Sequence, residues 1–280
     1  MAIDDNLKYS VLMSLYKKEK PEFLIESIES MLKQTYSAEE ILIVKDGPLT
    51  NQLDLILSNY KLSNPRLFSI VELKDNLGLG LALNEGLKSC RNELVARMDT
   101  DDISLNNRCE LQIEEFMKNP LLCIVGTWIN EFYDHPSNTL TSRVVPVNHN
   151  DIMKFSRRRS PFNHPTVMYK KSAVLNSGGY KNVMRKEDID LFVRMLHHGC
   201  IAKNIPKSLL LYRSNKDSLK RRKTWVNCKS YIKVIYNFWR MGYSSLLDFL
   251  IVFISQITFF IIPVWMLKII NNKILRGKPL

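Results

Sequence analysis

The sequence predicts an α/β fold in which helices cover a largely parallel β-sheet. From Tyr9 to about Arg213, apolar runs of strand length alternate with segments whose apolar residues recur at helical spacing. Acidic residues follow directly after several apolar runs, and open α/β sheets bind their ligands at the carboxyl ends of strands. A basic and then uncharged stretch follows Arg213, so we expect a hydrophobic, helical tail beside this domain.

The first half of the domain repeats strands and helices in order. Residues 11–15 form the first predicted strand, and Pro21 opens a helix where its missing N–H is not needed. The inward face of this helix carries apolar residues at helical spacing: Leu24, Ile25, Ile28, Met31 and Leu32. Further strands are predicted over residues 41–44, 67–71 and 94–98, with a helix after Asn76 that precedes the last of them.

Three carboxylates follow the strand at 94–98 within four residues, namely Asp99, Asp101 and Asp102. Like charges at this density are costly unless a cation or a raised pKa relieves them. Mg²⁺ or Mn²⁺ suits such a cluster because it shares its remaining positions with substrate phosphates. An EF-hand does not fit, since Ser104 stands where that loop requires glycine. A solvated acidic turn remains the alternative.

The second half of the domain has a looser pattern. Polar, proline-containing stretches around residues 134–150 and the basic run Arg157–Arg159 are interpreted as loops on the acceptor side. An amphipathic helix is predicted over residues 187–198, with Gly199 as its C-terminal stop.

Composition limits the function classes. Of the 280 residues 45% are hydrophobic, which excludes disorder as the main state, and the net charge is +12. That charge suits a nucleic acid, an anionic membrane or a phosphorylated ligand. The five scattered cysteines and an N-terminus without a signal-peptide pattern favour a reduced, cytoplasmic compartment.

The segment after Arg213 has the composition of a membrane-seeking tail. Lysines and arginines between 216 and 240 precede the uncharged stretch 249–267, and basic residues also follow it. Since about 20 apolar residues are needed to span a bilayer, we favour a helix in the interface, with a single span as the runner-up. A buried core helix or an oligomer contact is the third alternative.

Taken in order, several segments of the chain together resemble family 2 of the glycosyltransferases, which has the GT-A fold. These segments are residues 10–19 (SVLMSLYKKE), 27–35 (SIESMLKQT), 41–47 (ILIVKDG), 76–86 (NLGLGLALNEG), 96–102 (ARMDTDD) and 186–196 (KEDIDLFVRML). The resemblance spans residues 9–213. It implies a Rossmann-like nucleotide-binding sandwich with a mixed, mainly parallel sheet and a catalytic domain over 1–215. The composition after Arg213 adds a membrane-associating segment over 216–280.

The resemblance also implies roles for individual residues. The side chains implied to bind the donor are Tyr16, Glu19, Asp46 and Asp99. Asp101 and Asp102 would hold Mg²⁺ or Mn²⁺, and Asp188 would be the general base of a single, inverting displacement. Side chains on the acceptor side would be Glu187, His164 and Arg157, although a structural histidine and a solvated basic loop remain alternatives for the last two.

The implied reaction moves a hexosyl residue, galactosyl or glucosyl, from a UDP-linked donor to a polyprenyl-diphosphate-linked saccharide. The setting would be O-antigen, capsule or exopolysaccharide assembly at the cytoplasmic face of the cell membrane, on an anionic surface. Lys17, Lys45 and Pro48 depart from the family pattern and leave the donor open.

Two other function classes compete with this reading. A basic nucleic-acid-binding protein lacks support because no groove-reading module is recognisable, so we expect no nucleic-acid partner. A catalytically inactive membrane scaffold of the same fold is disfavoured by the intact Asp101 and Asp188.

Overall fold

The computed structural model describes residues 7–214, 223–263 and 266. The strands of the described chain are β1 (Tyr9–Leu15), β2 (Glu40–Lys45), β3 (Phe68–Glu72), β4 (Leu94–Met98), β5 (Ile103–Ser104), β6 (Leu122–Phe132), β7 (Thr139–Arg143), β8 (Met168–Lys170) and β9 (Ile201–Arg213). The helices are α1 (Pro21–Leu32), α2 (Asn51–Ser63), α3 (Leu79–Ser89), α4 (Arg108–Lys118), α5 (His149–Ser156), α6 (Lys171–Asn176), α7 (Glu187–His197), α9 (Trp225–Arg240) and α10 (Leu246–Ile261).

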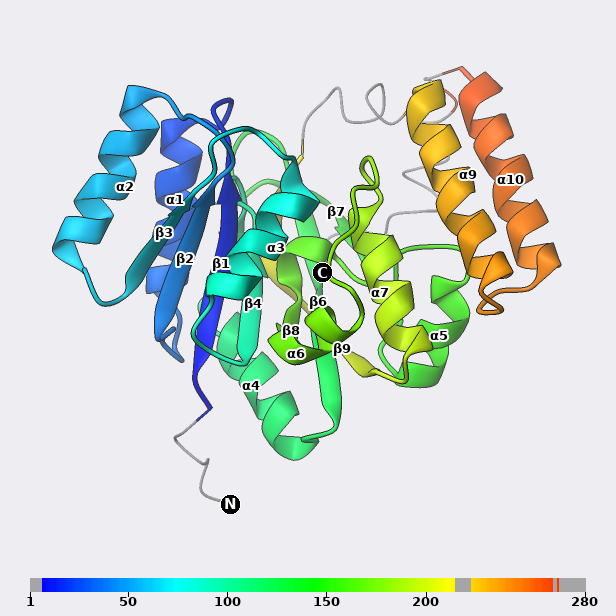
Figure 1. The fold of residues 1–280 in the computed structure, drawn as a ribbon, viewed down its shortest axis with the longest axis horizontal. Coiled ribbons are helices and arrows are strands. Elements are labelled where there is room, and N and C mark those ends of the chain that lie inside the picture. The colour runs from blue at the N-terminus through cyan, green and yellow to red at the C-terminus, as the bar shows by residue number, and fades with distance from the viewer. Residues whose placement is uncertain (1–6, 215–222, 264–265, 267–280) are drawn as a thin grey trace.

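The strands form one mixed sheet in the order β3-β2-β1-β4-β8-β6-β9-β5, with β7 paired to β6 (Figure 1). Strands β3, β2, β1 and β4 are mutually parallel, so their carboxyl ends meet at one edge. Strand β8 runs antiparallel to both β4 and β6, while β6 and β9 are parallel. The α/β fold with a mixed sheet that the sequence predicts is therefore confirmed.

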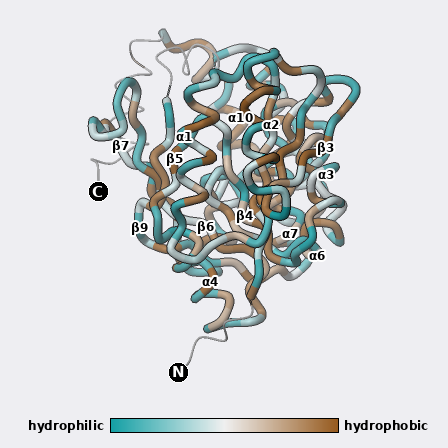
Figure 2. Tube along the Cα trace, turned by 90° about the vertical axis from the view of Figure 1, so that its left-hand side faces the viewer, coloured by the Kyte–Doolittle hydropathy of each residue, from teal (hydrophilic) through white to brown (hydrophobic). Residues whose placement is uncertain are grey.

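Helices cover both faces of this sheet, because successive side chains along a strand point to opposite faces. Leu12 and Val95 lie on the face that α3, α7 and α9 cover. Val11 and Ala96 lie on the other face, under α1, α2 and α4. Figure 2 shows hydrophobic residues running through the interior and hydrophilic ones along the outer loops. Three layers result, and the edge with the strand ends stays open.

Helices α1 and α7 confirm the periodicity arguments with one correction. Helix α1 begins at Pro21, but Ile25 is 41% exposed rather than on the buried face. The buried stripe follows Leu24, Ile28 and Met31, at a spacing of four and then three residues, and Ile25 lies beyond its edge. Helix α7 buries its predicted apolar face and is followed by Gly199, whose φ of +84° suits a C-terminal stop.

The loops expected over residues 134–150 are a further correction. Strand β7 pairs there antiparallel with β6, with Ile129 opposite Arg143, and α5 begins at His149. The sequence of β7, TLTSR, has no apolar run because this strand lies off the main path of the sheet and is mostly half-buried or exposed. Its threonines suit an extended strand, but apolar and polar residues do not alternate clearly enough along it to predict one.

Helices α9 and α10 form a pair beside α5 and α7 at one end of the molecule (Figure 1). Val234, Ile235 and Phe238 of α9 and Val252 of α10 belong to the same core as α7. In the ranges that the structure describes, no helix has both the length and the apolar character needed to cross a membrane. The residues beyond 266 lie outside those ranges, and the division at 215 remains a prediction.

Candidate active site

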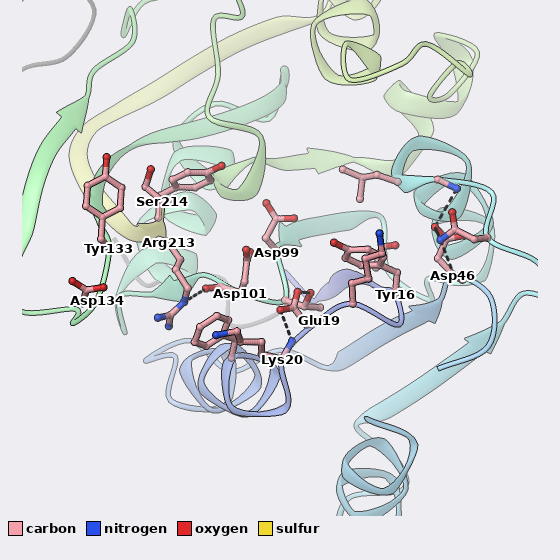
Figure 3. Close-up of a pocket in the computed structure, with 18 residues that line it drawn as sticks. Tyr16, Glu19, Lys20, Asp46, Asp99, Asp101, Tyr133, Asp134, Arg213 and Ser214 are labelled. Carbon is pink, nitrogen blue, oxygen red and sulfur yellow. Dashed lines mark hydrogen bonds between the residues drawn. The ribbon is translucent and has the colours of Figure 1, made fainter. Parts of the chain in front are cut away.

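A cleft of about 910 Å³ lies at the carboxyl edge of the parallel strands. Tyr16 and Glu19 follow β1, Asp46 follows β2, and Asp99 and Asp101 follow β4. Figure 3 shows Asp99 and Asp101 in the middle of this cleft, with Tyr16 and Asp46 toward one side. The topology therefore brings together five residues that the sequence places up to 85 positions apart.

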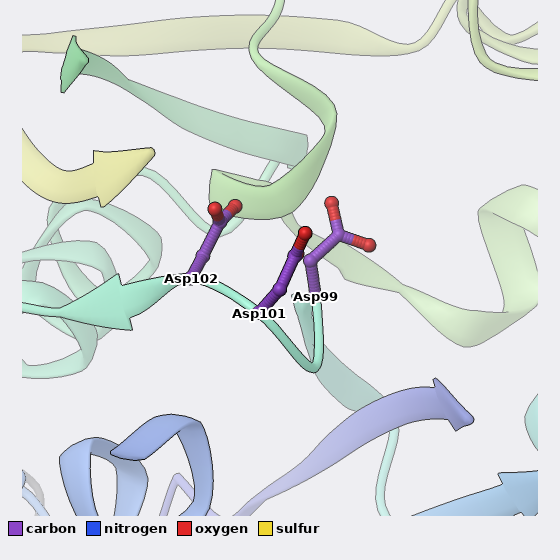
Figure 4. A group of neighbouring side chains, drawn as sticks. All are labelled: Asp99, Asp101 and Asp102. Carbon is purple, nitrogen blue, oxygen red and sulfur yellow. The ribbon is translucent and has the colours of Figure 1, made fainter. Parts of the chain in front are cut away.

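The three aspartates of the β4–β5 loop form a compact acidic cluster (Figure 4). One carboxylate oxygen from each of Asp99, Asp101 and Asp102 lies within 4.8 Å of the others. Asp102 is fully buried, and its Oδ1 accepts a hydrogen bond from the backbone N–H of Arg213 at 2.8 Å. Burial, and then repulsion among these carboxylates, raises the pKa values of Asp101 and Asp102.

These residues fit a divalent cation. Oδ2 of Asp102 is buried without a hydrogen-bond partner, and a buried carboxylate oxygen without a partner is unfavourable in the absence of a cation or a proton. Oxygen ligands in this number and spacing are those that Mg²⁺ and Mn²⁺ prefer. Asp99, Asp101 and Asp102 would therefore hold the ion, with the open cleft left for a ligand.

A buried arginine lies directly beneath the cluster. Arg97, in strand β4, is only 1% exposed, and its Nη2 lies 2.6 Å from Oδ1 of Asp99. Its Nε and Nη1 have no hydrogen-bond partner. The sequence analysis assigned it no role, although a charged residue inside an otherwise apolar strand was a usable signal, since buried charge requires a partner.

Two further contacts fix the acidic loop. Thr100 donates a hydrogen bond from Oγ1 to Oε2 of Glu19 at 2.8 Å, which joins the β1 and β4 loops. Arg213 donates from Nε to the backbone oxygen of Asp101 at 2.8 Å, and its guanidinium lies 3.9 Å from the centre of the Phe23 ring. Sequence reasoning missed Arg213, because no local pattern reveals a contact across 112 positions.

Asp46 organises the loop that leads into α3. Its carboxylate accepts hydrogen bonds from the backbone N–H of Leu77 at 2.7 Å, the N–H of Gly78 at 3.1 Å and Nδ2 of Asn76 at 3.0 Å. The side chain is 4% exposed. Asp46 therefore shapes the wall of the cleft, and its neighbour Tyr16 is the more exposed of the two toward solvent.

The acidic start of α7 lies beside this cleft, although Glu187 and Asp188 are not among the residues that line it. A Cβ built on Gly80, next to Leu79 of the cleft wall, would lie 3.1 Å from Cβ of Glu187. Burial, and next the charge of Asp188, raises the pKa of Glu187 to about 7. The charge of Arg97, which pairs with Asp99, opposes that rise.

His164 and Arg157 lie apart from the cleft. Nε2 of His164 is 2.9 Å from the hydroxyl oxygen of Tyr180, and the ring packs edge-on against Phe192. Burial holds the pKa of His164 well below its usual range, so this ring is neutral. Arg157 is exposed at a second pocket, beside Asp248 of α10.

The fold and this cleft define a glycosyltransferase of the GT-A type. The chain belongs to glycosyltransferase family 2, since residues 10–186 match the family described as "Glycosyl transferase family 2". The match ends at the residue before the acidic pair that opens α7.

Similar proteins agree with this assignment. The "UDP-Gal:alpha-D-GlcNAc-diphosphoundecaprenol beta-1,3-galactosyltransferase" of Escherichia coli is 38% identical over 98% of this chain and 98% of its own. The "Amylovoran biosynthesis glycosyltransferase AmsE" of Erwinia amylovora is 39% identical over 81% of this chain and 84% of its own. A mannosyltransferase of Pyrobaculum calidifontis, solved with GDP-Man and Mn²⁺, superposes with a TM-score of 0.66 at 15% identity, covering 95% of this chain and 74% of its own.

Proposed function

We propose that this enzyme transfers a hexosyl residue, galactosyl or glucosyl, from a UDP-linked donor to a polyprenyl-diphosphate-linked saccharide, with inversion and with the help of a divalent cation. The setting is surface polysaccharide assembly, in O-antigen or capsule formation. The observation that carries the proposal is the acidic cluster in the cleft, beside which the acidic start of α7 lies. The activity of the E. coli relative, which is similar to this chain along nearly its whole length, supports the choice of donor and acceptor.

The donor lies in the cleft in this proposal. Tyr16, Glu19, Asp46 and Asp99 line it and position the nucleotide and its sugar. Asp101 and Asp102, with Asp99 beside them, would hold Mg²⁺ or Mn²⁺, and the bound ion would supply positive charge for the diphosphate leaving group. Arg97 forms an ion pair with Asp99, and Glu19 accepts a hydrogen bond from Thr100. These two contacts keep the loop in one conformation during the transfer.

The acceptor is activated by Asp188 in this proposal. Its carboxylate takes the proton from the acceptor hydroxyl while that oxygen forms the new bond to the anomeric carbon and the bond to the diphosphate breaks. Asp188 lies in the first turn of α7, at the positive end of the helix dipole. Glu187 lies beside it and is the second acid toward the acceptor. One displacement from the opposite side inverts the anomeric configuration.

The membrane surface is the proposed working place. The outward side of α10 exposes large apolar side chains, with Leu247 and Ile254 each 62% exposed and Ile261 71% exposed. These residues recur every seven positions and lie on one stripe of the helix. A helix of this kind lies in the membrane interface, and neighbouring basic residues favour an anionic cytoplasmic leaflet.

The test is a donor and acceptor panel. Purified enzyme with Mn²⁺ is incubated with UDP-, TDP- and GDP-sugars, with and without a saccharide linked by diphosphate to a lipid. We expect nucleoside diphosphate release with a UDP-hexose, accelerated by the acceptor and abolished by EDTA. Metal-independent release, or no release with any sugar nucleotide, would contradict the proposal.

A further inference from the structure

We propose that a basic pocket between α5 and α10 binds the diphosphate of the lipid-linked acceptor and thereby selects diphosphate-linked acceptors. The pocket has a volume of about 540 Å³ and is lined by Pro146, Asp151, Lys154, Phe155, Arg157, Arg158, Arg159 and Asp248. This inference rests on the proposed function, because it assigns a place to a part of the proposed acceptor.

The charge of the basic pocket suits a diphosphate. Four basic side chains and two acidic ones line it. Asp248 is already paired, since its Oδ1 lies 2.5 Å from Nε of Arg158. Within the part of the chain that the structure describes, Arg157 and Arg159 form no ion pair with an acid. The guanidinium of Arg159 lies 5.1 Å from the centre of the Phe155 ring, a contact with a ring face that leaves its N–H groups able to donate to a phosphate. Arginine is the side chain best suited to binding phosphate oxygens through two parallel hydrogen bonds.

Helix α9 connects the basic pocket to the start of α7. The hydroxyl of Tyr231 in α9 donates a hydrogen bond to the backbone oxygen of Arg158 at 2.7 Å. On its other side, Nζ of Lys186, two residues before Asp188, lies 4.9 Å from the centre of the Tyr231 ring. Burial raises the pKa of Tyr231 to about 12, the charge of Arg159 opposes that rise and the charge of Asp188 adds to it. Tyr231 therefore contacts Arg158 of the basic pocket on one side and Lys186, next to the start of α7, on the other.

The other side of the basic pocket leads to the apolar surface of α10. Asp248 lies in the first turn of α10, next to the exposed Leu247, and Ile251 follows one turn later. Figure 1 shows α5 below α7 and near the lower end of the α9–α10 pair. Outward from α7, the proposed base Asp188 comes first, the basic pocket second and the apolar surface of α10 third. A lipid-linked acceptor has the same order of parts, namely a sugar, a diphosphate and a lipid.

The experiment compares two acceptors that differ in the diphosphate alone. One carries the sugar on a diphosphate linked to an alkyl chain, and the other carries the same sugar on the alkyl chain directly. The variants are Arg157→Ala, Arg159→Ala and the double variant, with Arg157→Lys to retain charge without the planar fork. Arg66→Ala is the matched control, because Arg66 is an exposed arginine on the opposite flank of the molecule, between α2 and β3.

We expect the wild-type enzyme and Arg66→Ala to prefer the diphosphate acceptor, and the double variant to lose about tenfold or more of that preference in kcat/KM. Each single alanine variant should lose part of the preference for the diphosphate acceptor. Arg157→Lys should lose less of this preference than Arg157→Ala. Unchanged thermal melting of the variants shows that they fold, which the exposure of Arg157 favours.

Three other outcomes are informative. A double variant that keeps the full preference overturns the inference. A second outcome is that the variants keep the acceptor preference and bind anionic vesicles more weakly, relative to phosphatidylcholine vesicles. That result shows that the pocket binds a lipid headgroup, and it also overturns the inference. A wild-type enzyme that transfers to neither acceptor refutes the proposed function itself, so the two failures are distinguishable.

Discussion

At the scale of single residues, the candidate site is built on buried charge. Arg97 and Asp102 are both almost fully buried, and each has a polar atom without a protein partner. An isolated buried charge costs several kcal/mol, so such atoms persist where another charge compensates them. Arg97 is compensated by Asp99, and a cation would compensate Asp102. The carboxylate loop is thus held in a shape that suits a metal before the ligand arrives.

Asp188→Asn tests the proposed base. We expect it to lower the rate of sugar transfer by about 10²- to 10⁴-fold, because the amide cannot accept the acceptor proton. Binding of UDP with Mn²⁺, measured by isothermal titration calorimetry, should change little, since the cleft is not lined by Asp188. Glu114→Gln is the control, because this carboxylate of α4 is half-exposed and pairs with the exposed Lys118. Simultaneous loss of transfer and UDP binding, or loss of neither, would argue against this role.

The acidic residues also predict a pH dependence of the metal-free protein. Burial, and next the charge of Asp188, raises the pKa of Glu187 from an ordinary value of 4.5 to about 7, and burial likewise raises the pKa values of Asp101 and Asp102. The folded state therefore binds these protons more tightly than the unfolded state. Their contribution to stability is present at low pH and is lost as the pH rises through about 7.

Thermal melting with EDTA and with Mn²⁺, between about pH 5 and pH 8, measures this effect. We expect the melting temperature in EDTA to fall as the pH rises from about 5 to about 8, in addition to any change that the other titrating groups of the protein cause. Because protons compete with the cation for carboxylates, the rise in melting temperature that Mn²⁺ produces should be larger at the alkaline end. A rise that is equal at all pH values would contradict a cation site made of these carboxylates.

At the scale of elements, the strands that end at the cleft could be predicted and several of those beyond it could not. Strands β1, β2 and β4 are almost entirely buried and mostly apolar, so sequence alone predicts them and the loops that follow. Strand β7 is polar and peripheral, and its pattern is that of a loop. Arg213 reaches the acidic loop through the pairing of β9 with β5, a register that only the folded sheet determines. The candidate aspartates could therefore be predicted, and the arginine that holds them could not.

Gly86→Ala tests how α3 is seated on the sheet. A Cβ on Gly86 would lie 2.4 Å from Cδ1 of Leu12 and 2.7 Å from Cγ2 of Val44. Overpacking of this kind costs about 1–3 kcal/mol, and the better helix propensity of alanine offsets about 1 kcal/mol of it. We expect a net loss of about 0–2 kcal/mol in the free energy of unfolding, measured in urea, and a value toward the upper end because both contacts are shorter than 3.0 Å. Lys88→Ala, on the exposed side of the same helix, should stay within about 0.5 kcal/mol of the wild type. An alanine variant as stable as the wild type would show that α3 shifts freely.

At the scale of the whole molecule, the proposed sites lie along one direction. The candidate donor cleft is at the carboxyl edge of the sheet, α7 follows beside it, and the α9–α10 pair forms the far end of the molecule in Figure 1. The pair is part of the core on one side, through Phe238 and Val252, and exposes apolar side chains on the other. Membrane docking by α10 would therefore place the lipid surface at a fixed position relative to Asp188.

Because α9 and α10 contribute to the core, deleting them would test folding as much as docking. The sharper variant is Leu247→Glu with Ile254→Glu, which changes two exposed side chains one above the other on α10 and leaves Val252 in place. Its matched control is Leu55→Glu with Leu62→Glu on α2, which are 62% and 78% exposed, have the same spacing and lie on the opposite flank.

Burying one leucine or isoleucine side chain contributes about 1.5–3 kcal/mol, and a glutamate adds repulsion from anionic lipid. A loss of about 1.4 kcal/mol in binding free energy lowers a partition coefficient tenfold. We therefore expect the α10 variant to partition onto anionic vesicles at least tenfold less than the wild type. The α2 variant should partition like the wild type, although it carries the same change in charge. Equal loss in both variants would show that net charge alone governs binding. If both variants partition onto anionic vesicles like the wild type, the membrane contact lies outside the exposed stripe of α10.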